Sequence, residues 1–233
     1  MTTNLNRHRL FALVADRQRL ATRGQEQGLT LIECLVAIIM VALVGSAIAP
    51  ALVISVASRV QSQKAEQALE LAQSEIDRVR VLVERGQATT DNLPPAVAAN
   101  DISDESAIAE VNGPLIGNPV AEPSTPFETR LVDLQGNQFA VQVFRSPGLV
   151  VNDVPVAFRL GVRVYDEQAV TSEGSGNLPT VPASLGMTGG TGERGQRPLA
   201  ALYTTVARGD VSTSMCNYIR YVGSDADLPL GCD

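Results

Sequence analysis

One apolar stretch constrains this chain more than any other feature. It runs from Gly28 to Pro50, GLTLIECLVAIIMVALVGSAIAP, and Glu33 is its only charged residue. About 20 consecutive apolar residues are enough to cross a bilayer as an α-helix. A carboxylate inside such a helix costs about 2.5–3.5 kcal/mol at mid-bilayer and less near an interface. We therefore expect Glu33 to have a partner charge that becomes exposed nearby when the chain is cut or assembled.

The residues before this stretch favour a cytoplasmic N-terminus. Residues 1–28 hold five arginines against two acids, and basic flanks stay on the cytoplasmic side. A cleaved secretory signal would place Pro50 directly after the small-residue site Ala47-Ile48-Ala49, where it is poorly tolerated. A lipoprotein signal would need its cysteine after the apolar run, whereas Cys34 lies near the start. A plain signal anchor explains the hydrophobicity and the arginines, but it leaves Glu33 unexplained.

The next segment has the pattern of an amphipathic helix. Between Arg59 and Arg85, apolar residues recur at alternating steps of four and three, which places them on one face. This stripe comprises Ala65, Leu69, Ala72, Ile76, Val79 and Val83. It spans too few heptads to favour a coiled coil, so we expect it to pack on a sheet. Gly86 is a natural end for the helix.

The C-terminal half has the period of two that is typical of strands. After an irregular connector with one short helix near Asp104–Val111, apolar and polar residues alternate. The expected strands are Glu128–Leu134, Gln138–Arg145, Val156–Tyr165 and Leu199–Arg208, and Gln135-Gly136-Asn137 joins the first two as a hairpin. The third is expected to be half-buried. The sequence thus predicts an α+β fold in which a long N-terminal helix packs on a small antiparallel sheet.

At the apolar stretch the chain resembles the type IV pilins and pseudopilins. The similarity lies in the basic leader, the motif Gly28-Leu29-Thr30-Leu31-Ile32-Glu33, the apolar helix and Pro50. It implies that prepilin peptidase cuts between Gly28 and Leu29 and that the new N-terminus is N-methylated. Glu33 is then the fifth mature residue and Pro50 the twenty-second, as in the family. Leu29 stands where the family more often has phenylalanine or methionine.

Two further stretches resemble a narrower group. SRVQSQKAEQALELAQSEIDRVRVLVERG (Ser58–Gly86) and LYTTVARGD (Leu202–Asp210) are similar to the hormogonium polysaccharide secretion pseudopilins of filamentous cyanobacteria. This resemblance implies a minor, structural subunit of a pilus-like machine that exports polysaccharide for gliding motility. The alternatives are a type II secretion pseudopilin and a signal-anchored periplasmic domain that never assembles.

For Glu33 and Pro50, an assembly role competes with a simpler one. In a stack of processed subunits, Glu33 can pair with the N-terminal amine of a neighbour and fix the axial step; alternatively, its carboxylate snorkels to the headgroups. Pro50 removes one backbone donor and weakens or kinks the helix. By resemblance, this segment loosens on assembly; the simpler reading is a static kink.

The expected layout follows from these assignments. It comprises a cleaved leader (1–28), an assembly helix (29–55), its amphipathic continuation (56–86), a connector (87–126) and a sheet body (127–233). The resemblance implies a single pass of the inner membrane with the body in the periplasm. The implied partners are prepilin peptidase, other pilin-like subunits, the inner-membrane assembly platform and membrane lipid.

The redox state of the cysteines depends on the compartment that holds the C-terminal body. Cys34 lies in the apolar run, whereas Cys216 and Cys232 lie near the end of the chain. If the body is exported, these last two can form a disulfide that closes a short loop. Two free thiols in a cytosolic protein are the alternative.

Several function classes are not expected. The acidic sequence, with formal net charge −7 and no basic residue between Arg85 and Arg130, argues against nucleic-acid binding and a DNA-uptake role. The only histidine, His8, lies in the leader, and no catalytic framework is recognisable, so an enzyme is not expected.

Nucleotide binding is not expected at the glycine-rich stretch Gly189-Gly190-Thr191-Gly192, because it lacks the Gly-Lys-Ser/Thr of a phosphate loop. Asp225 and Asp227 could ligate calcium, but two nearby carboxylates are more often solvated, so we assign no metal to these two residues and no cofactor to the chain.

Overall fold

The computed structural model of the protein describes residues 30–98, 105–117, 119–183, 195–209, 214–223 and 232. The chain divides into two compact units, Met1–Val56 and Ala57–Asp233. Helix α2 (Leu31–Glu84) contributes to both. Its first part is long and apolar enough to cross a membrane. Its second part packs against the sheet of the second unit, which we call the body, and this confirms the expected α+β layout.

Within the body, α2 buries one face and exposes its charged side. The expected positions Ala72, Ile76, Val79 and Val83 are all buried. The expectation for Leu69 is wrong, because 42% of this residue is exposed. The buried face begins instead at Ala68, one position before Leu69.

The C-terminal end of α2 is closed by a glycine, as expected. Gly86 has φ of 66°, a left-handed conformation that costs glycine little. Its N–H donates to the carbonyl of Val83 at 3.1 Å, and the N–H of Gln87 donates to the carbonyl of Leu82 at 3.1 Å. These two bonds form a Schellman motif, which satisfies carbonyls that the helix end would otherwise leave unpaired.

The described strands form one antiparallel five-stranded sheet. They are β1 (Arg130–Leu134), β2 (Asn137–Arg145), β3 (Leu149–Val151), β4 (Val154–Asp166) and β5 (Ala200–Ala207). β4 is the longest strand, and it pairs with β2 and β3 and also with β5. Four of these strands were expected within a few residues of their observed bounds, and β3 was not.

The expected hairpin between β1 and β2 turns over two residues. Gln135 has φ of 55° and Gly136 has φ of 83°. Positive φ at both central residues matches the right-handed twist of the flanking strands. The Asp133 carboxylate accepts a hydrogen bond from the Gly136 N–H at 3.2 Å. The tight turn fixes the register, with Leu134 opposite Asn137 and Val132 opposite Phe139.

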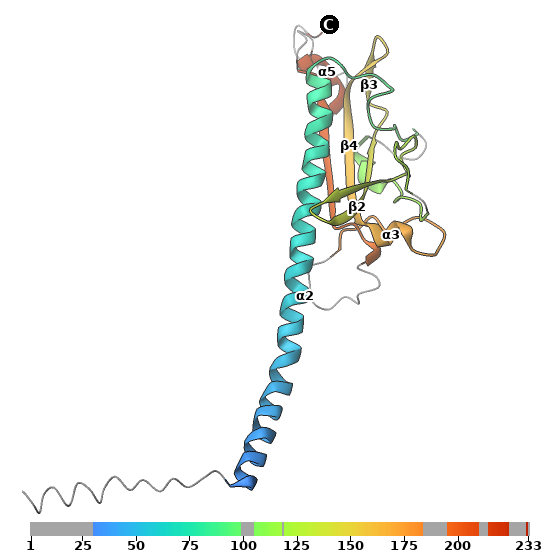
Figure 1. The fold of residues 1–233 in the computed structure, drawn as a ribbon. Coiled ribbons are helices and arrows are strands. Elements are labelled where there is room, and N and C mark those ends of the chain that lie inside the picture. Colours follow the sequence, from blue (N-terminus) through green and yellow to red (C-terminus); the bar gives the residue numbers. More distant parts are fainter. Residues whose placement is uncertain are drawn as a thin grey trace, which may run out of the picture. The chain divides into compact units, whose positions relative to one another are not determined.

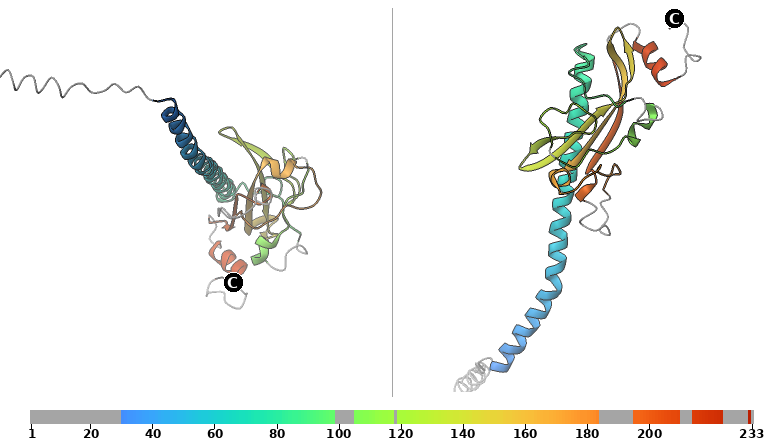
Figure 2. Two further views of the ribbon diagram at one scale, coloured as in Figure 1. Left: turned by 90° about the horizontal axis from the view of Figure 1, so that it is seen from below. Right: turned by 90° about the vertical axis from the view of Figure 1, so that its right-hand side faces the viewer.

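The main core lies between α2 and one face of the sheet. Figures 1 and 2 show the second part of α2 lying along that face. Alternate residues of the strands point to α2, which is the expected period of two. They include Phe139, Val141 and Val143 of β2, and Phe158, Leu160, Val162 and Val164 of β4. Burying this apolar surface, at about 25 cal/mol per Å², is the main force that holds the helix to the sheet.

The opposite face of β4 is also buried, so the expectation of a half-buried strand is wrong. Residues from the connector and from the 3₁₀ helix η1 (Glu105–Glu110) pack against Phe144 on this face. Arg163 is fully buried there. Its guanidinium donates to the Tyr203 hydroxyl at 2.8 Å and to the Ala109 carbonyl at 3.0 Å. These bonds offset the cost of burying the charge and tie the connector to the sheet.

Two short helices complete the body. α3 (Glu167–Thr171) directly follows β4, and the Asp166 carboxylate caps it by accepting from the Gln168 N–H at 3.2 Å. α5 (Ser214–Val222) lies near the end of the chain. Neither was expected from the sequence, because both are too short to show a helical period.

A close approach between strands generates the first prediction. A Cβ on Gly161 would lie 2.6 Å from the ring of Phe144, which is itself held under the Arg163 guanidinium. We expect Gly161→Ala to lower the free energy of unfolding by about 1–3 kcal/mol, because the ring has to move within a packed layer. Denaturant unfolding measures this. Gly195→Ala, which meets no atom within 4 Å, is the control and should have little effect; equal loss in both variants would contradict the packing argument.

The connector generates a prediction about pH. The Glu128 carboxylate accepts from the N–H groups of Ser124 and Thr125 at 2.6 and 3.0 Å, and these bonds hold the pKa of Glu128 below its ordinary value. A carboxyl group whose pKa is lower in the folded state stabilises the fold at pH values above its unfolded-state pKa. This stabilisation is lost as the pH falls through its folded-state pKa. Glu128→Gln should therefore lower the unfolding midpoint at neutral pH, and the difference from the native chain should vanish in strong acid. Thermal unfolding across pH measures this, and a constant difference would contradict it.

Candidate functional site

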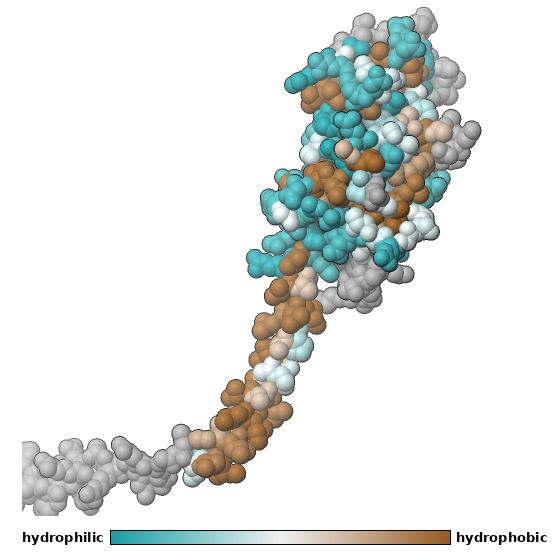
Figure 3. Space-filling view, turned by 45° about the vertical axis from the view of Figure 1, so that its right-hand side comes forward, coloured by the Kyte–Doolittle hydropathy of each residue, from teal (hydrophilic) through white to brown (hydrophobic). Residues whose placement is uncertain are grey.

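The first part of α2 offers an apolar surface to its surroundings. Every residue from Thr30 to Gln63 is exposed. Figure 3 shows this surface as mostly hydrophobic, with a few pale, less hydrophobic residues between the brown ones, in contrast with the mixed surface of the body. An exposed apolar surface of this extent is typical of a segment that contacts lipid or other protein chains.

Thr30 and Glu33 form the start of this helix. The Thr30 hydroxyl accepts a hydrogen bond from the Glu33 N–H at 3.3 Å, and the Thr30 carbonyl accepts from the Cys34 N–H at 3.1 Å. Thr-x-x-Glu is the capping-box sequence, in which a hydroxyl residue satisfies an unpaired N–H of the first turn. Glu33 is also the acid of that first turn, where the helix dipole favours negative charge. Sequence reasoning missed the role of Thr30, although the motif was there to find it.

The processing residues Gly28 and Leu29 lie outside the described residues, so cleavage and methylation stay predictions. Glu33 lies four residues after Leu29 in the sequence and is exposed. Its position in the first turn agrees with a role at the edge of the apolar helix.

Pro50 lies inside α2 without ending it. The helix is continuous from Leu31 to Glu84. A proline lacks the N–H that would bond the carbonyl four residues earlier, here that of Ser46. The Ser46 hydroxyl donates to the Leu43 carbonyl at 2.8 Å, which is a second local departure from the simple helical pattern. The loosening of this segment on assembly stays a prediction.

A shallow apolar hollow lies on the same helix before Pro50. It has a volume of about 400 Å³ and is lined by Met40, Val41, Val44, Gly45 and Ile48. A Cβ added to Gly45 would meet no other atom within 4 Å, so the missing side chain leaves room at this position. Small residues allow membrane helices to approach one another closely.

The C-terminal cysteines are bonded in the structure. Cys216 on α5 and Cys232 form a disulfide with a Cα–Cα distance of 5.3 Å. α5 is also tied to the sheet through a hydrogen bond between the Ser146 and Tyr221 hydroxyls at 3.2 Å. Cys34 is a free, exposed cysteine.

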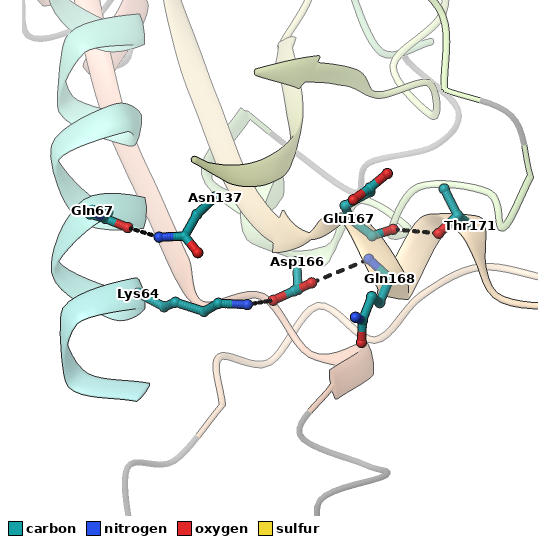
Figure 4. A network of polar contacts seen from close by, with 7 residues as sticks. All are labelled: Lys64, Gln67, Asn137, Asp166, Glu167, Gln168 and Thr171. Atoms are coloured by element: carbon teal, nitrogen blue, oxygen red, sulfur yellow. Dashed lines mark hydrogen bonds and ion pairs between the residues drawn. The ribbon is translucent and has the colours of Figure 1, made fainter. Parts of the chain in front are cut away.

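A polar clasp joins α2 to one end of the sheet, and Figure 4 shows it. Lys64, the only lysine in the sequence, lies 2.7 Å from the carboxylate of Asp166. One turn later, the Gln67 side chain accepts from the Asn137 amide at 2.9 Å. Because both Lys64 and Asp166 are partly exposed, their ion pair is worth at most about 1 kcal/mol. The clasp was not expected, since the partners are far apart in the sequence.

A second ionic contact is more deeply buried. Glu75 is only 6% exposed, and its carboxylate accepts from Arg78 at 3.0 Å and from Arg130 of β1. These charges join α2 to the edge of the sheet beside a groove of about 570 Å³. Within the described ranges, no group of three His, Cys, Asp or Glu residues is placed to hold a metal ion. Asp225 and Asp227 lie outside those ranges.

Comparison with known proteins adds no relative: no protein-family model, no curated protein and no solved structure matches this chain.

The cysteine pair generates a prediction about stability. A disulfide closing a loop of this length adds about 3 kcal/mol by limiting the unfolded chain. Replacing both Cys216 and Cys232 by serine should therefore lower the free energy of unfolding by about that amount. Peptide mapping without reductant should recover the two cysteines in one cross-linked fragment. Cys34→Ser is the matched control and should leave both readouts unchanged; separate fragments from the unreduced native chain would contradict the pairing.

Proposed function

We propose that the chain is a minor pilin-like structural subunit, a pseudopilin. It is cut by prepilin peptidase after Gly28 and assembled into a pilus-like machine from the inner membrane, with the body in the periplasm. It is not an enzyme in this proposal. Its work is mechanical, and its partners are other pilin-like subunits and the assembly platform.

One observation carries the proposal. A fully exposed apolar helix begins with a capped turn that contains an acid, and the same helix continues into a packed body. A plain membrane anchor needs the apolar length but has no use for a carboxylate at that position. A stacked subunit uses both, because its apolar face packs on neighbours and its acid meets their N-terminal amines.

Two roles of Glu33 can be separated. As a capping residue it contributes through hydrogen bonding, which glutamine at the same position also supplies. As an ion-pair partner it needs its charge, because an amine left unpaired within an assembled stack would be costly. The proposal assigns the second role to Glu33 in addition to the first.

Polysaccharide export linked to gliding motility is the specific process that we propose. Its support is the sequence resemblance at residues 58–86 and 202–210. A type II secretion pseudopilin is the alternative, because it would share the helix, the leader and the processing site. A signal-anchored domain that never assembles would share the helix and the body alone.

The test compares variants expressed in the native host. Glu33→Gln keeps the capping geometry and the helix but removes the charge, so we expect a processed, folded subunit that is lost from the assembled fraction. Export of polysaccharide should fall with it. Glu70→Gln, an exposed acid on the body part of α2, is the control and should assemble normally.

Immunoblots of membrane and assembled fractions give the readout. Normal assembly of the Glu33→Gln subunit would contradict the proposed ion pair between Glu33 and a neighbouring amine. Normal export without any assembled subunit would favour the anchored domain. Loss of protein secretion with intact polysaccharide export would favour the type II alternative.

A further inference from the structure

The outer edge of β5 is a candidate binding surface. β5 pairs with β4 along its whole length, and β4 is its only partner among the described strands. A strand at the edge of a sheet presents a row of unpaired N–H and C=O groups to its surroundings. Such a row can bond to a further extended segment of chain.

The register identifies the outward groups. The register pairs Ala157 with Ala207, which places Val156 opposite Arg208 just beyond the end of β5. The N–H of Arg208 donates to the carbonyl of Val156 at 2.8 Å, so these two residues form a hydrogen-bonded pair. In an antiparallel ladder, hydrogen-bonded and non-bonded pairs alternate. The even-numbered residues of β5 therefore bond to β4. The odd-numbered ones direct their N–H and C=O groups outward, and these are Ala201, Tyr203, Thr205 and Ala207.

The other side of the sheet obeys the same alternation. The N–H of Ser146 donates to the carbonyl of Arg159, which places the odd residues of β4 toward β2 and its even residues toward β5. Arg145 correspondingly bonds away from β4, to Pro95 and Val97. The assignment of the outward row thus agrees with independent hydrogen bonds.

The outward row is unpaired within the described part of the chain. No backbone N–H of Ala201, Tyr203, Thr205 or Ala207 donates to a described residue on that side. The one contact there is a long one, 3.5 Å, from the Thr204 hydroxyl to the Thr205 carbonyl. Four consecutive outward residues with free donors are enough to bond a short extended segment.

Two of the edge strands of the sheet, β1 and β5, are protected differently. β1 is short, carries Arg130 and Asp133, and has the neighbouring Thr129 carbonyl occupied by the Val120 N–H. Charged side chains and short length are the usual protection of an edge against pairing. β5, with the sequence AALYTTVA, is longer and has no charged residue and no proline. Its edge lacks both forms of protection.

The edge is also rigid. On one side, Arg80 of α2 donates to the Thr204 hydroxyl at 3.2 Å. On the other, the Tyr203 hydroxyl accepts from the buried Arg163 at 2.8 Å, and the Tyr203 ring packs with the cluster around Phe144. A strand held on both faces binds with little loss of conformational freedom.

We propose that the free edge of β5 accepts an extended, uncharged strand of a second protein chain by β-strand addition. The outward groups repeat every second residue, about 6.8 Å apart, and backbone in the β conformation matches that spacing. The lack of charge on β5 favours a partner strand with small, β-branched or aromatic residues, which form the stabilising cross-strand pairs.

The occupant is a strand of a different chain. Pairing two β5 edges antiparallel would relate two bodies by a two-fold axis perpendicular to the sheet. The α2 segments packed on the two sheets, residues 57–84, would then run in opposite directions, because this part of α2 lies along one face of the sheet (Figure 1). A strand of a different chain is free of this constraint.

The inference rests on the body alone and does not require the proposed function. A free peptide has no anchor and escapes the orientation constraint, so β5 itself supplies a probe. The outward rows of two β5 strands match in antiparallel register, with Tyr203 opposite Thr205 and Ala201 opposite Ala207. The probe is a fluorescent peptide of residues 200–207 with a lysine tail for solubility.

The experiment measures binding of this peptide to the full chain in detergent micelles. Thr205→Pro removes an outward N–H that β4 does not use, and proline is tolerated at such edge positions. Thr205→Val keeps the N–H and is the matched control. We expect saturable binding to the native chain and to Thr205→Val, and at least about tenfold weaker binding to Thr205→Pro.

Hydrogen exchange of the native chain is the second measurement, and it does not depend on a variant. The peptide should slow exchange at the amides of Ala201, Tyr203, Thr205 and Ala207. Absence of saturable binding to the native chain would overturn the proposal. So would equal binding to both Thr205 variants, or protection confined to other parts of the chain.

Discussion

The packing of α2 on the sheet is the interaction on which the rest of the structure depends. Val79 and Val83 are completely buried against the apolar face formed by β2, β4 and β5. The sheet on its own would expose that face to water, and the helix on its own would expose its stripe. Once they are joined, the connector can cover the opposite face, where Arg163 bonds it to the strands. The body therefore has three layers, which are α2, the sheet and the connector with η1.

The same helix has two kinds of surface, and the change between them is abrupt. Up to Gln63 every described residue is exposed, and from Ala68 onward one face is buried. Between these points the contacts are polar, namely those of Lys64 and Gln67 with the end of the sheet. Such contacts hold the helix in place without extending the apolar core. The proposed function would use this separation, because a subunit that leaves a membrane and enters a stack needs an exposed apolar segment beside a body that is already packed.

Sequence periodicity predicted the parts of the fold that local chemistry decides. The apolar stripe from Ala72 to Val83 and the alternation in β2 and β4 follow from spacing, and the end of the helix follows from the conformational freedom of Gly86. It failed where distant segments decide burial, since nothing in β4 indicates that the connector covers its second face. The Lys64–Asp166 pair joins residues 102 positions apart and has no local signal. At the candidate site, Thr30 was predictable from its spacing to Glu33, whereas cleavage between Gly28 and Leu29 stays a prediction, because both residues lie outside the described ranges.

The most direct test of the central claim is the mass of the N-terminal peptide of the protein isolated from its native host. If the subunit is processed for assembly, the mature chain begins at Leu29, four residues before Glu33, and its amine is free or methylated. A chain that still begins at Met1, or one cut at any other position, would contradict the account, because Glu33 would then have no new amine at the matching position on a neighbouring subunit.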